Sequence, residues 1–313
     1  MFRRILVPLD GSTFAEHALP HAVKAAQIHD TDLVLLLVQV RQTPATTDLV
    51  LREAIDEWEV TQSAREADYL ERLATRTAHD HGVRVTHHLP RGEVVPCIEE
   101  EVKRQNIDLV VMTTHGRAGL ERAWLGSVAD ALLRHIDVPI LLIRPTAEEP
   151  GDSAGRGSEE PGDSAGRGSF GHILVALDGS ERAERAILPG RALADREGAR
   201  ITLLRVVTPP FVMTSPFLPH AVHITNEEME LRTQTATHYV EDVLAGLPAH
   251  GDDVHATVIV DYHPAPAILG YAAENDVDLI AISTHGRGPV RRLIMGSVTD
   301  KVVRASNVPV LIC

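Results

Sequence analysis

Short apolar segments alternate with longer segments of helical period along the first half of the chain. Apolar residues at helical spacing predict helices over Phe14–Ile28, Leu49–His81, Glu93–Gln105 and Ser127–His135. The segments between them are apolar or alternating, which is typical of strands: Ile5–Leu9, Leu33–Val40, Val83–Leu89, Asp108–Met112 and Pro139–Ile143. Strands that alternate with helices indicate right-handed βαβ units, so we predict an α/β fold with a parallel sheet.

The second half of the chain repeats this series. Its predicted strands are Ile173–Leu177, Ile201–Val207, Val254–Val260, Asp278–Ile282 and Pro309–Cys313. Four blocks match in the same order in the two halves: Arg4–Ser12 with His172–Ser180, Thr114–Arg117 with Thr284–Arg287, Leu125–Val128 with Met295–Val298, and Val138–Ile143 with Val308–Cys313. We therefore predict two copies of one domain, over residues 1–146 and 171–313.

A second repeat separates the two predicted domains. The eleven residues Glu148–Ser158 recur without change as Glu159–Ser169, and none has an apolar side chain larger than proline. Such a composition buries too little surface to offset the entropy of ordering, so residues 147–170 are predicted to be a flexible linker. A tail that binds a partner is the alternative.

The composition argues against several classes of partner and binding motif. Thirty basic residues against 44 acidic ones give a net charge of −14, which argues against a general affinity for nucleic acid or anionic membranes. We find no signal peptide and no apolar run of about 20 residues, so a cytoplasmic protein without a membrane partner is expected. Two cysteines exclude a disulfide framework. None of the three lysines follows a glycine, so the commonest phosphate-binding loop is absent.

Parallel sheets bind ligands beyond the carboxyl ends of their strands, where the strand order reverses. Unusual residues lie at the ends of the first and fourth predicted strands of each domain. At the end of the first strand these are Pro8, Asp10, Gly11 and Ser12, with Ala176, Asp178, Gly179 and Ser180 in the second domain. After the fourth they are Thr113, His115, Gly116, Arg117, Gly119, Gly126, Ser127 and Val128, with Ser283, His285, Gly286, Arg287, Gly288, Gly296, Ser297 and Val298.

The second of these groups suits a phosphate. Glycines let backbone N–H groups approach a ligand, a helix N-terminus adds unpaired donors and a positive dipole end, and an arginine adds charge. Ser127 and Ser297 are predicted to cap the following helices. An aspartate can accept hydrogen bonds from a ribose hydroxyl or a base amino group. Each motif alone is also typical of a plain turn and helix cap, but their recurrence at one spacing in both halves favours a binding site.

These motifs resemble the universal stress protein family over both halves, everything except the linker. The family's nucleotide-binding pattern is glycine, two residues, glycine, nine residues, glycine, then serine or threonine. Gly116 with Gly126-Ser127, and Gly286 with Gly296-Ser297, fit this pattern. Thr113 and Ser283 stand where the first glycine would be.

The resemblance implies two doubly wound, Rossmann-like domains, each with a five-stranded parallel sheet of order 3-2-1-4-5. It implies ATP as the ligand, with or without Mg²⁺, one site per domain. Asp10 and Asp178 correspond to the family's first-strand aspartate, and Val38 and Val206 to its adenine-side hydrophobe. It also implies pairing of the fifth strands, here as an intramolecular pseudo-dimer, with a homodimer as an alternative.

The main functional hypothesis is therefore an ATP-binding regulator of the stress response, read by an unidentified protein partner. Two alternatives remain open: a slow ATPase, for which no general base is evident, and a nucleotide-free scaffold that dimerises. Seventeen histidines show no metal-ligand spacing, so no metal is predicted. Cys97 is assigned to core packing, and Thr208–Pro219 to a domain face or pocket rim.

Overall fold

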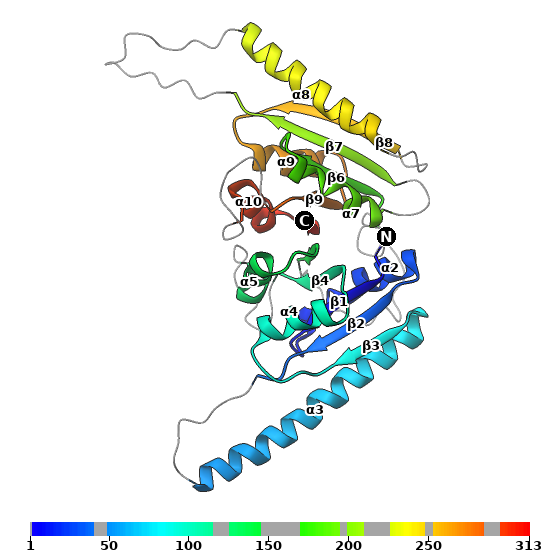
Figure 1. The fold of residues 1–313 in the computed structure, drawn as a ribbon, viewed down its shortest axis with the longest axis vertical. Helices are drawn as coiled ribbons and strands as arrows, with labels where there is room; N and C mark the ends of the chain where they lie inside the picture. The colour runs from blue at the N-terminus through cyan, green and yellow to red at the C-terminus, as the bar shows by residue number, and fades with distance from the viewer. Residues whose placement is uncertain are drawn as a thin grey trace, which may run out of the picture. The chain divides into compact units, whose positions relative to one another are not determined.

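The computed structural model describes residues 2–40, 49–114, 125–144, 170–194, 199–209, 226–247, 253–284 and 295–313. The chain divides into two compact units, Met1–Ser169 and Phe170–Cys313. Most of the segment predicted as a linker, and residues 210–219 of the predicted rim, lie outside the described residues. Figure 1 shows strands and helices alternating in each unit. The α/β fold class predicted from the periodicity is confirmed.

The strands of the first unit are all parallel and pair in the order β3-β2-β1-β4-β5. Their bounds are β1 (Arg4–Leu9), β2 (Asp32–Leu37), β3 (Val85–His88), β4 (Leu109–Thr113) and β5 (Ile140–Ile143). The helices between them are α1 (Thr13–Glu16), α2 (Leu19–His29), α3 (Leu49–His81), α4 (Val94–Arg104) and α5 (Ser127–His135).

The second unit has the same arrangement, with the parallel order β8-β7-β6-β9-β10. Its strands are β6 (His172–Leu177), β7 (Arg200–Val207), β8 (Asp253–Val260), β9 (Leu279–Ile282) and β10 (Val310–Ile312). Its helices are α6 (Glu181–Glu184), α7 (Ile187–Ala192), α8 (Asn226–Gly246), α9 (Pro264–Glu274) and α10 (Ser297–Ala305). Both orders are those implied by the family resemblance.

The core of each unit is its central strands. Every residue of β4 and of β6 is buried, because helices cover both faces of a parallel sheet. The side chains that fill these strands are branched aliphatic ones, such as Val110 and Val175, rather than aromatic ones. Among the described helices, none is both long and apolar enough to cross a membrane.

One predicted helix, Phe14–Ile28, is wrong as a single element. The structure divides it into α1, which ends at Glu16, and α2, which begins at Leu19. Pro20 lies in the first turn of α2. It has no N–H to donate to a carbonyl one turn earlier, so the helix cannot continue through it. The break leaves α1 as one short turn directly after the β1 strand end.

Candidate functional site

The sheet order places the described residues at the ends of the first and fourth strands of each unit beside one another. Strand β1 lies between β2 and β4, with Ile5 opposite Leu109. The chain therefore leaves β1 toward one side of the sheet while β4 lies on the other, which is the switch point of a doubly wound fold. Asp10 follows β1 and Thr114 follows β4, so both lie at this switch point. Strands β6 and β9 repeat the arrangement in the second unit.

The aspartate after each first strand is held by a local hydrogen-bonded turn. Asp10 Oδ1 accepts from the Ser12 N–H at 2.9 Å and from its hydroxyl at 2.5 Å. Ser12 Oγ in turn accepts from Ala15 N–H at 3.2 Å and caps α1. Asp178, Ser180 and Ala183 repeat these bonds at 3.0, 2.6 and 3.3 Å. The turn thus caps the following helix, as a simple turn would. It also fixes a half-buried carboxylate at the end of the strand.

The glycines between these residues are required by backbone geometry. Gly11 has a φ of 79° and Gly179 a φ of 85°. Residues with a Cβ rarely adopt this left-handed conformation, so glycine is the natural choice there. The identical turn in both units is therefore built into the sequence Asp-Gly-Ser.

The N-terminus of α5 is held against the end of β4. Gly126 N–H donates to the Thr114 carbonyl at 2.7 Å, and the Gly126 carbonyl accepts from Asp130 N–H at 2.9 Å. Gly296 and Thr284 repeat the first bond at 2.9 Å. A Cβ added to Gly296 would lie 3.2 Å from the Thr284 carbonyl oxygen. This close approach explains the glycine and brings the helix dipole to the switch point.

The predicted capping role of Ser127 and Ser297 is wrong. Gly126 and Gly296 occupy the N-cap, in an extended conformation, and neither cap has a side-chain hydrogen bond. Because the chain becomes helical one residue later, the serines are the first helical residues and are exposed. Their hydroxyls lie at the helix N-terminus rather than closing it.

The remaining predicted residues fall into three groups. Thr113 and Ser283, in place of the family's first glycine, are each 7% exposed, so they belong to the packed end of the sheet. Val38 and Val206 lie at the ends of the second strands, and Pro8, Ala176, Val128 and Val298 lie within or directly beside the elements described above. Eight predicted residues lie outside the described residues: His115, Gly116, Arg117, Gly119, His285, Gly286, Arg287 and Gly288.

A tyrosine–glutamate pair beside the aspartate turn was missed by sequence reasoning. Tyr69 on α3 donates to Glu16 Oε1 at 2.8 Å, and Tyr239 on α8 donates to Glu184 Oε1 at 2.9 Å. Burial raises the pKa of both phenols, and the adjacent glutamate raises it further. The bond joins the short helix after the turn to the long helix of the same unit. The signal in the sequence was the recurrence of both residue types at matching places in the two halves.

A second group of polar side chains holds the end of β2 against α3. Arg91 Nε donates to Gln39 Oε1 at 2.9 Å, and Gln39 Nε2 donates to Ser63 Oγ at 2.8 Å and Glu66 Oε2 at 3.0 Å. Gln39 directly follows Val38, the predicted adenine-side residue. This network therefore fixes the backbone next to Val38, where the family resemblance places the adenine.

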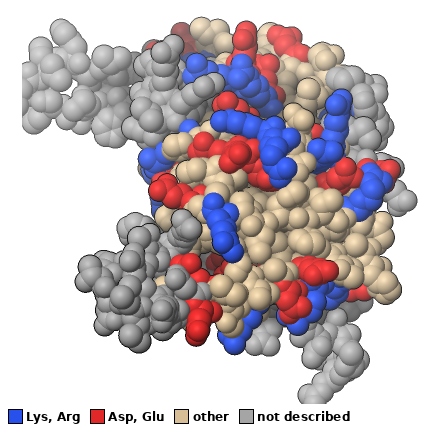
Figure 2. All heavy atoms as spheres, turned by 60° about the horizontal axis from the view of Figure 1, so that its bottom comes forward, with Lys and Arg blue, Asp and Glu red and all other residues tan. Residues whose placement is uncertain are grey.

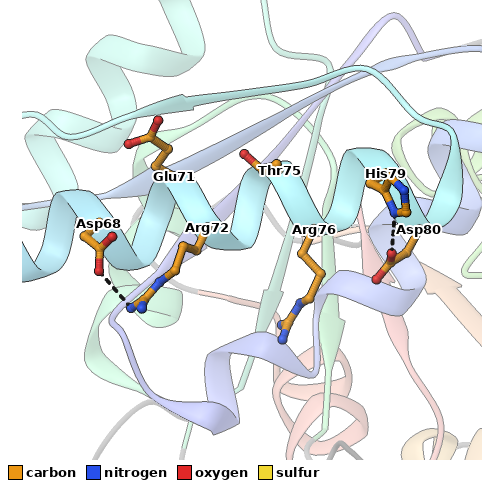
Figure 3. Close-up of a pocket in the computed structure, with 7 residues that line it drawn as sticks. All are labelled: Asp68, Glu71, Arg72, Thr75, Arg76, His79 and Asp80. Carbon is orange, nitrogen blue, oxygen red and sulfur yellow. Dashed lines mark hydrogen bonds and ion pairs between the residues drawn. The ribbon is translucent and has the colours of Figure 1, made fainter.

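A hollow of about 490 Å³ lies along α3 (Figure 3). Its lining residues all belong to that helix: Asp68, Glu71, Arg72, Thr75, Arg76, His79 and Asp80. Asp68 pairs with Arg72 at 3.0 Å, and His79 with Asp80 at 2.9 Å. Figure 2 likewise shows basic and acidic side chains interspersed on the face that it presents. The hollow is a charged surface groove, and none of the residues at the strand ends lines it.

In the described part of the chain, no group of three or more His, Cys, Asp or Glu side chains is placed to hold a metal ion. Burial raises the pKa of the Cys97 thiol, and Glu100 and Glu93 add to the effect. A Cβ at Gly92 would lie 3.0 Å from Cys97 Sγ, so this thiol packs against the turn before α4.

The sequence pattern of the universal stress protein family matches residues 1–144 and 169–313. The chain belongs to this family. A universal stress protein of Mycolicibacterium smegmatis is 24% identical and covers 98% of this chain and 96% of its own length. One of Thermus aquaticus is 33% identical over 46% of this chain, which is 98% of its own length.

The fold is also that of solved family members. The crystal structure of a universal stress protein from Archaeoglobus fulgidus has a TM-score of 0.67 to this chain. It is 18% identical and covers 99% of this chain and 97% of its own. The two tandem domains of this chain are therefore universal stress protein domains, as the motifs indicated.

Proposed function

We propose that each domain binds an adenine nucleotide, ATP, and that the protein is a nucleotide-responsive regulator in the stress response. The observation that carries this proposal is the duplicated site. In both domains a fixed carboxylate and a glycine-capped helix N-terminus lie at the ends of neighbouring strands, at the switch point. The recurrence of both features at the switch point of each domain, where open parallel sheets bind their ligands, supports a binding site there.

The described residues divide the work of binding. The carboxylates of Asp10 and Asp178 accept hydrogen bonds from the ribose or base. The first N–H groups of α5 and α10 donate to phosphate oxygens, aided by the helix dipole. Arg117 and Arg287, which the sequence places between these elements, are proposed to neutralise phosphate charge, with or without Mg²⁺.

The test begins with native mass spectrometry of the purified full chain, followed by calorimetric titration with ATP. We expect two nucleotides per chain. In the double variant Asp10→Asn and Asp178→Asn, both turns keep an acceptor oxygen for the serine but lose the charge, so affinity should fall at both sites. A wild-type chain that binds no adenine nucleotide at millimolar concentration would overturn the proposal.

A matched pair of glycine variants tests the second half of the site. Gly296→Ala places a methyl group 3.2 Å from the Thr284 carbonyl and so displaces the N-terminus of α10. Gly270→Ala, in α9, meets nothing within 4 Å and serves as the control. Only the first should weaken nucleotide binding. Equal nucleotide affinity in the two variants would show that the N-terminus of α10 does not contribute to binding.

A nucleotide-free scaffold is the second candidate function. Thr113 and Ser283 favour it, because a buried side chain stands in each domain where the family pattern has a glycine. We also propose that β5 and β10 pair edge to edge within one chain. A scaffold predicts an unoccupied chain in native mass spectrometry, and Thr113→Gly with Ser283→Gly would then create or strengthen nucleotide binding.

A further inference from the structure

The two domains differ in one residue at the edge of the candidate site. In the first domain Leu37, the last residue of β2, lies opposite Leu9. In the second domain Arg205 on β7 lies opposite Leu177, which is the residue that corresponds to Leu9. Leu37 is 3% exposed, whereas Arg205 is half-buried. A buried aliphatic side chain in one domain is thus a guanidinium in the other.

The guanidinium of Arg205 lies at the end of β6. Its Nη1 donates to the Leu177 carbonyl oxygen at 3.3 Å, and Leu177 directly precedes Asp178. Tyr239, bonded to Glu184 at 2.9 Å, feels both charges: Asp178 raises its pKa and Arg205 lowers it. One cation and two carboxylates therefore surround this end of the strand.

The first domain carries a guanidinium in a different place. Arg76 of α3 lies with its Nη2 3.5 Å from Glu16 Oε2, and its side chain is 64% exposed. Figure 3 shows Arg76 projecting from the helix among the residues of the surface groove. Counted from the paired tyrosines, Tyr69 and Tyr239, the corresponding residue of α8 is Gly246. The guanidinium near the tyrosine–glutamate pair is therefore exposed to solvent in the first domain, where it belongs to Arg76. In the second domain it belongs to Arg205 and lies at the end of β6.

We propose that Arg205 is a specificity-determining residue of the second domain, giving its site a preference for phosphorylated nucleotides over nucleosides that the first domain lacks. The inference rests on the proposed function. Asp178 and Glu184 have counterparts in Asp10 and Glu16, so the carboxylates do not distinguish the two sites. The cation does: the half-buried Arg205 attracts an anionic ligand more strongly than the exposed Arg76, because solvent screens it less. An uncharged nucleoside gains little from it.

The experiment titrates the full chain with ATP and with adenosine, using Arg205→Leu, the residue that the first domain has. We expect one of the two ATP sites to weaken about tenfold, the size of one partly screened charge, while adenosine binding changes little. Arg205→Lys should restore much of the preference because it keeps the charge. The control is Arg200→Leu, at the opposite end of β7, where Arg200 pairs with Asp253 at 3.8 Å.

The outcomes separate this inference from the proposed function. If the wild-type chain binds no adenine nucleotide, the proposed function fails. If it binds two but Arg205→Leu changes neither site, or weakens ATP and adenosine equally, the charge preference is refuted and the proposed function stands. Circular dichroism of each variant verifies the fold, and an Arg205→Gln variant replaces Arg205→Leu if the latter unfolds.

Discussion

At the scale of single residues, a phenol–carboxylate pair links the short helix to the long helix beside each candidate site. Tyr69→Phe and Tyr239→Phe each remove a hydrogen bond to a carboxylate, so each should cost about 1–2 kcal/mol of unfolding free energy. Denaturant unfolding monitored by circular dichroism measures this. Tyr262→Phe is the control, since Tyr262 is 60% exposed. Equal stability of all three variants would mean that the pairs contribute nothing.

Two histidines with lowered pKa values, one in each domain, make stability depend on pH in the mildly acidic range. Burial lowers the pKa of His21 to about 4, and His17 adds to the effect. Because the neutral form is favoured in the folded state, this stability is fully present above about pH 6.5. It is lost as pH falls toward 4, by about 3 kcal/mol. His21→Gln should flatten the dependence of the first domain's unfolding free energy on pH; an unchanged slope would contradict the assignment.

His172 has the same role in the second domain. Its Nδ1 donates to the Asn275 carbonyl at 2.8 Å, and its Nε2 shares a hydrogen bond with the Thr202 hydroxyl at 2.9 Å. Burial lowers its pKa. Because burial disfavours the charged ring in the folded state, the second domain should lose stability as the pH falls below about 6.5. Thermal unfolding between pH 5 and 8 should show a smaller loss in His172→Gln.

At the scale of elements, the turn after each first strand determines where the following helix begins. Gly179→Ala forces a side chain into a φ of 85° and should cost about 1–2 kcal/mol. Gly270→Ala, in the interior of α9 with open space around it, should instead stabilise by up to about 1 kcal/mol. Changes of opposite sign in the unfolding free energies of the two variants, measured with denaturant, would support the left-handed conformation of Gly179. Changes of the same sign would contradict it.

Sequence periodicity recovered those elements whose pattern is local. The bounds of α3 and α5 agree with the prediction. The helical pattern of α3 is long, and α5 begins directly after a glycine, Gly126. The division between α1 and α2 was missed, since Pro20 was counted within a helical pattern rather than as a break in it. Tyr69 and Glu16 were missed because their bond spans 53 residues, and the pattern of a single segment carries no information about such a contact. The aspartate turns were found because the residues that bond in them, the aspartate and the serine, are only two positions apart in the sequence.

At the scale of the whole molecule, the proposed pairing of the two domains rests on their unequal edges. β5 (Ile140–Ile143) and β10 (Val310–Ile312) end the two strand orders and carry only aliphatic side chains, whereas β3 (Val85–His88) at the other edge carries a threonine and two histidines. An unpaired apolar edge favours aggregation, so natural sheets usually cover it. Pairing within the chain would cover both apolar edges at once.

Hydrogen exchange can distinguish this pairing from separate domains. If β5 and β10 pair, the amides on their outer edges should exchange as slowly as those of β4, while the outer amides of β3 and β8 exchange faster. A single-chain mass in solution assigns the pairing to one molecule, and a doubled mass assigns it to two. Cys313 N–H donates to the Ile282 carbonyl of β9, so the neighbouring Ile312 N–H faces the outer edge of β10. Ile312→Pro removes this outer donor and should accelerate exchange in β5 as well if the strands are joined. Rapid exchange of β5 and β10 in the wild-type chain, matching that of β3, would show that the domains do not share a sheet.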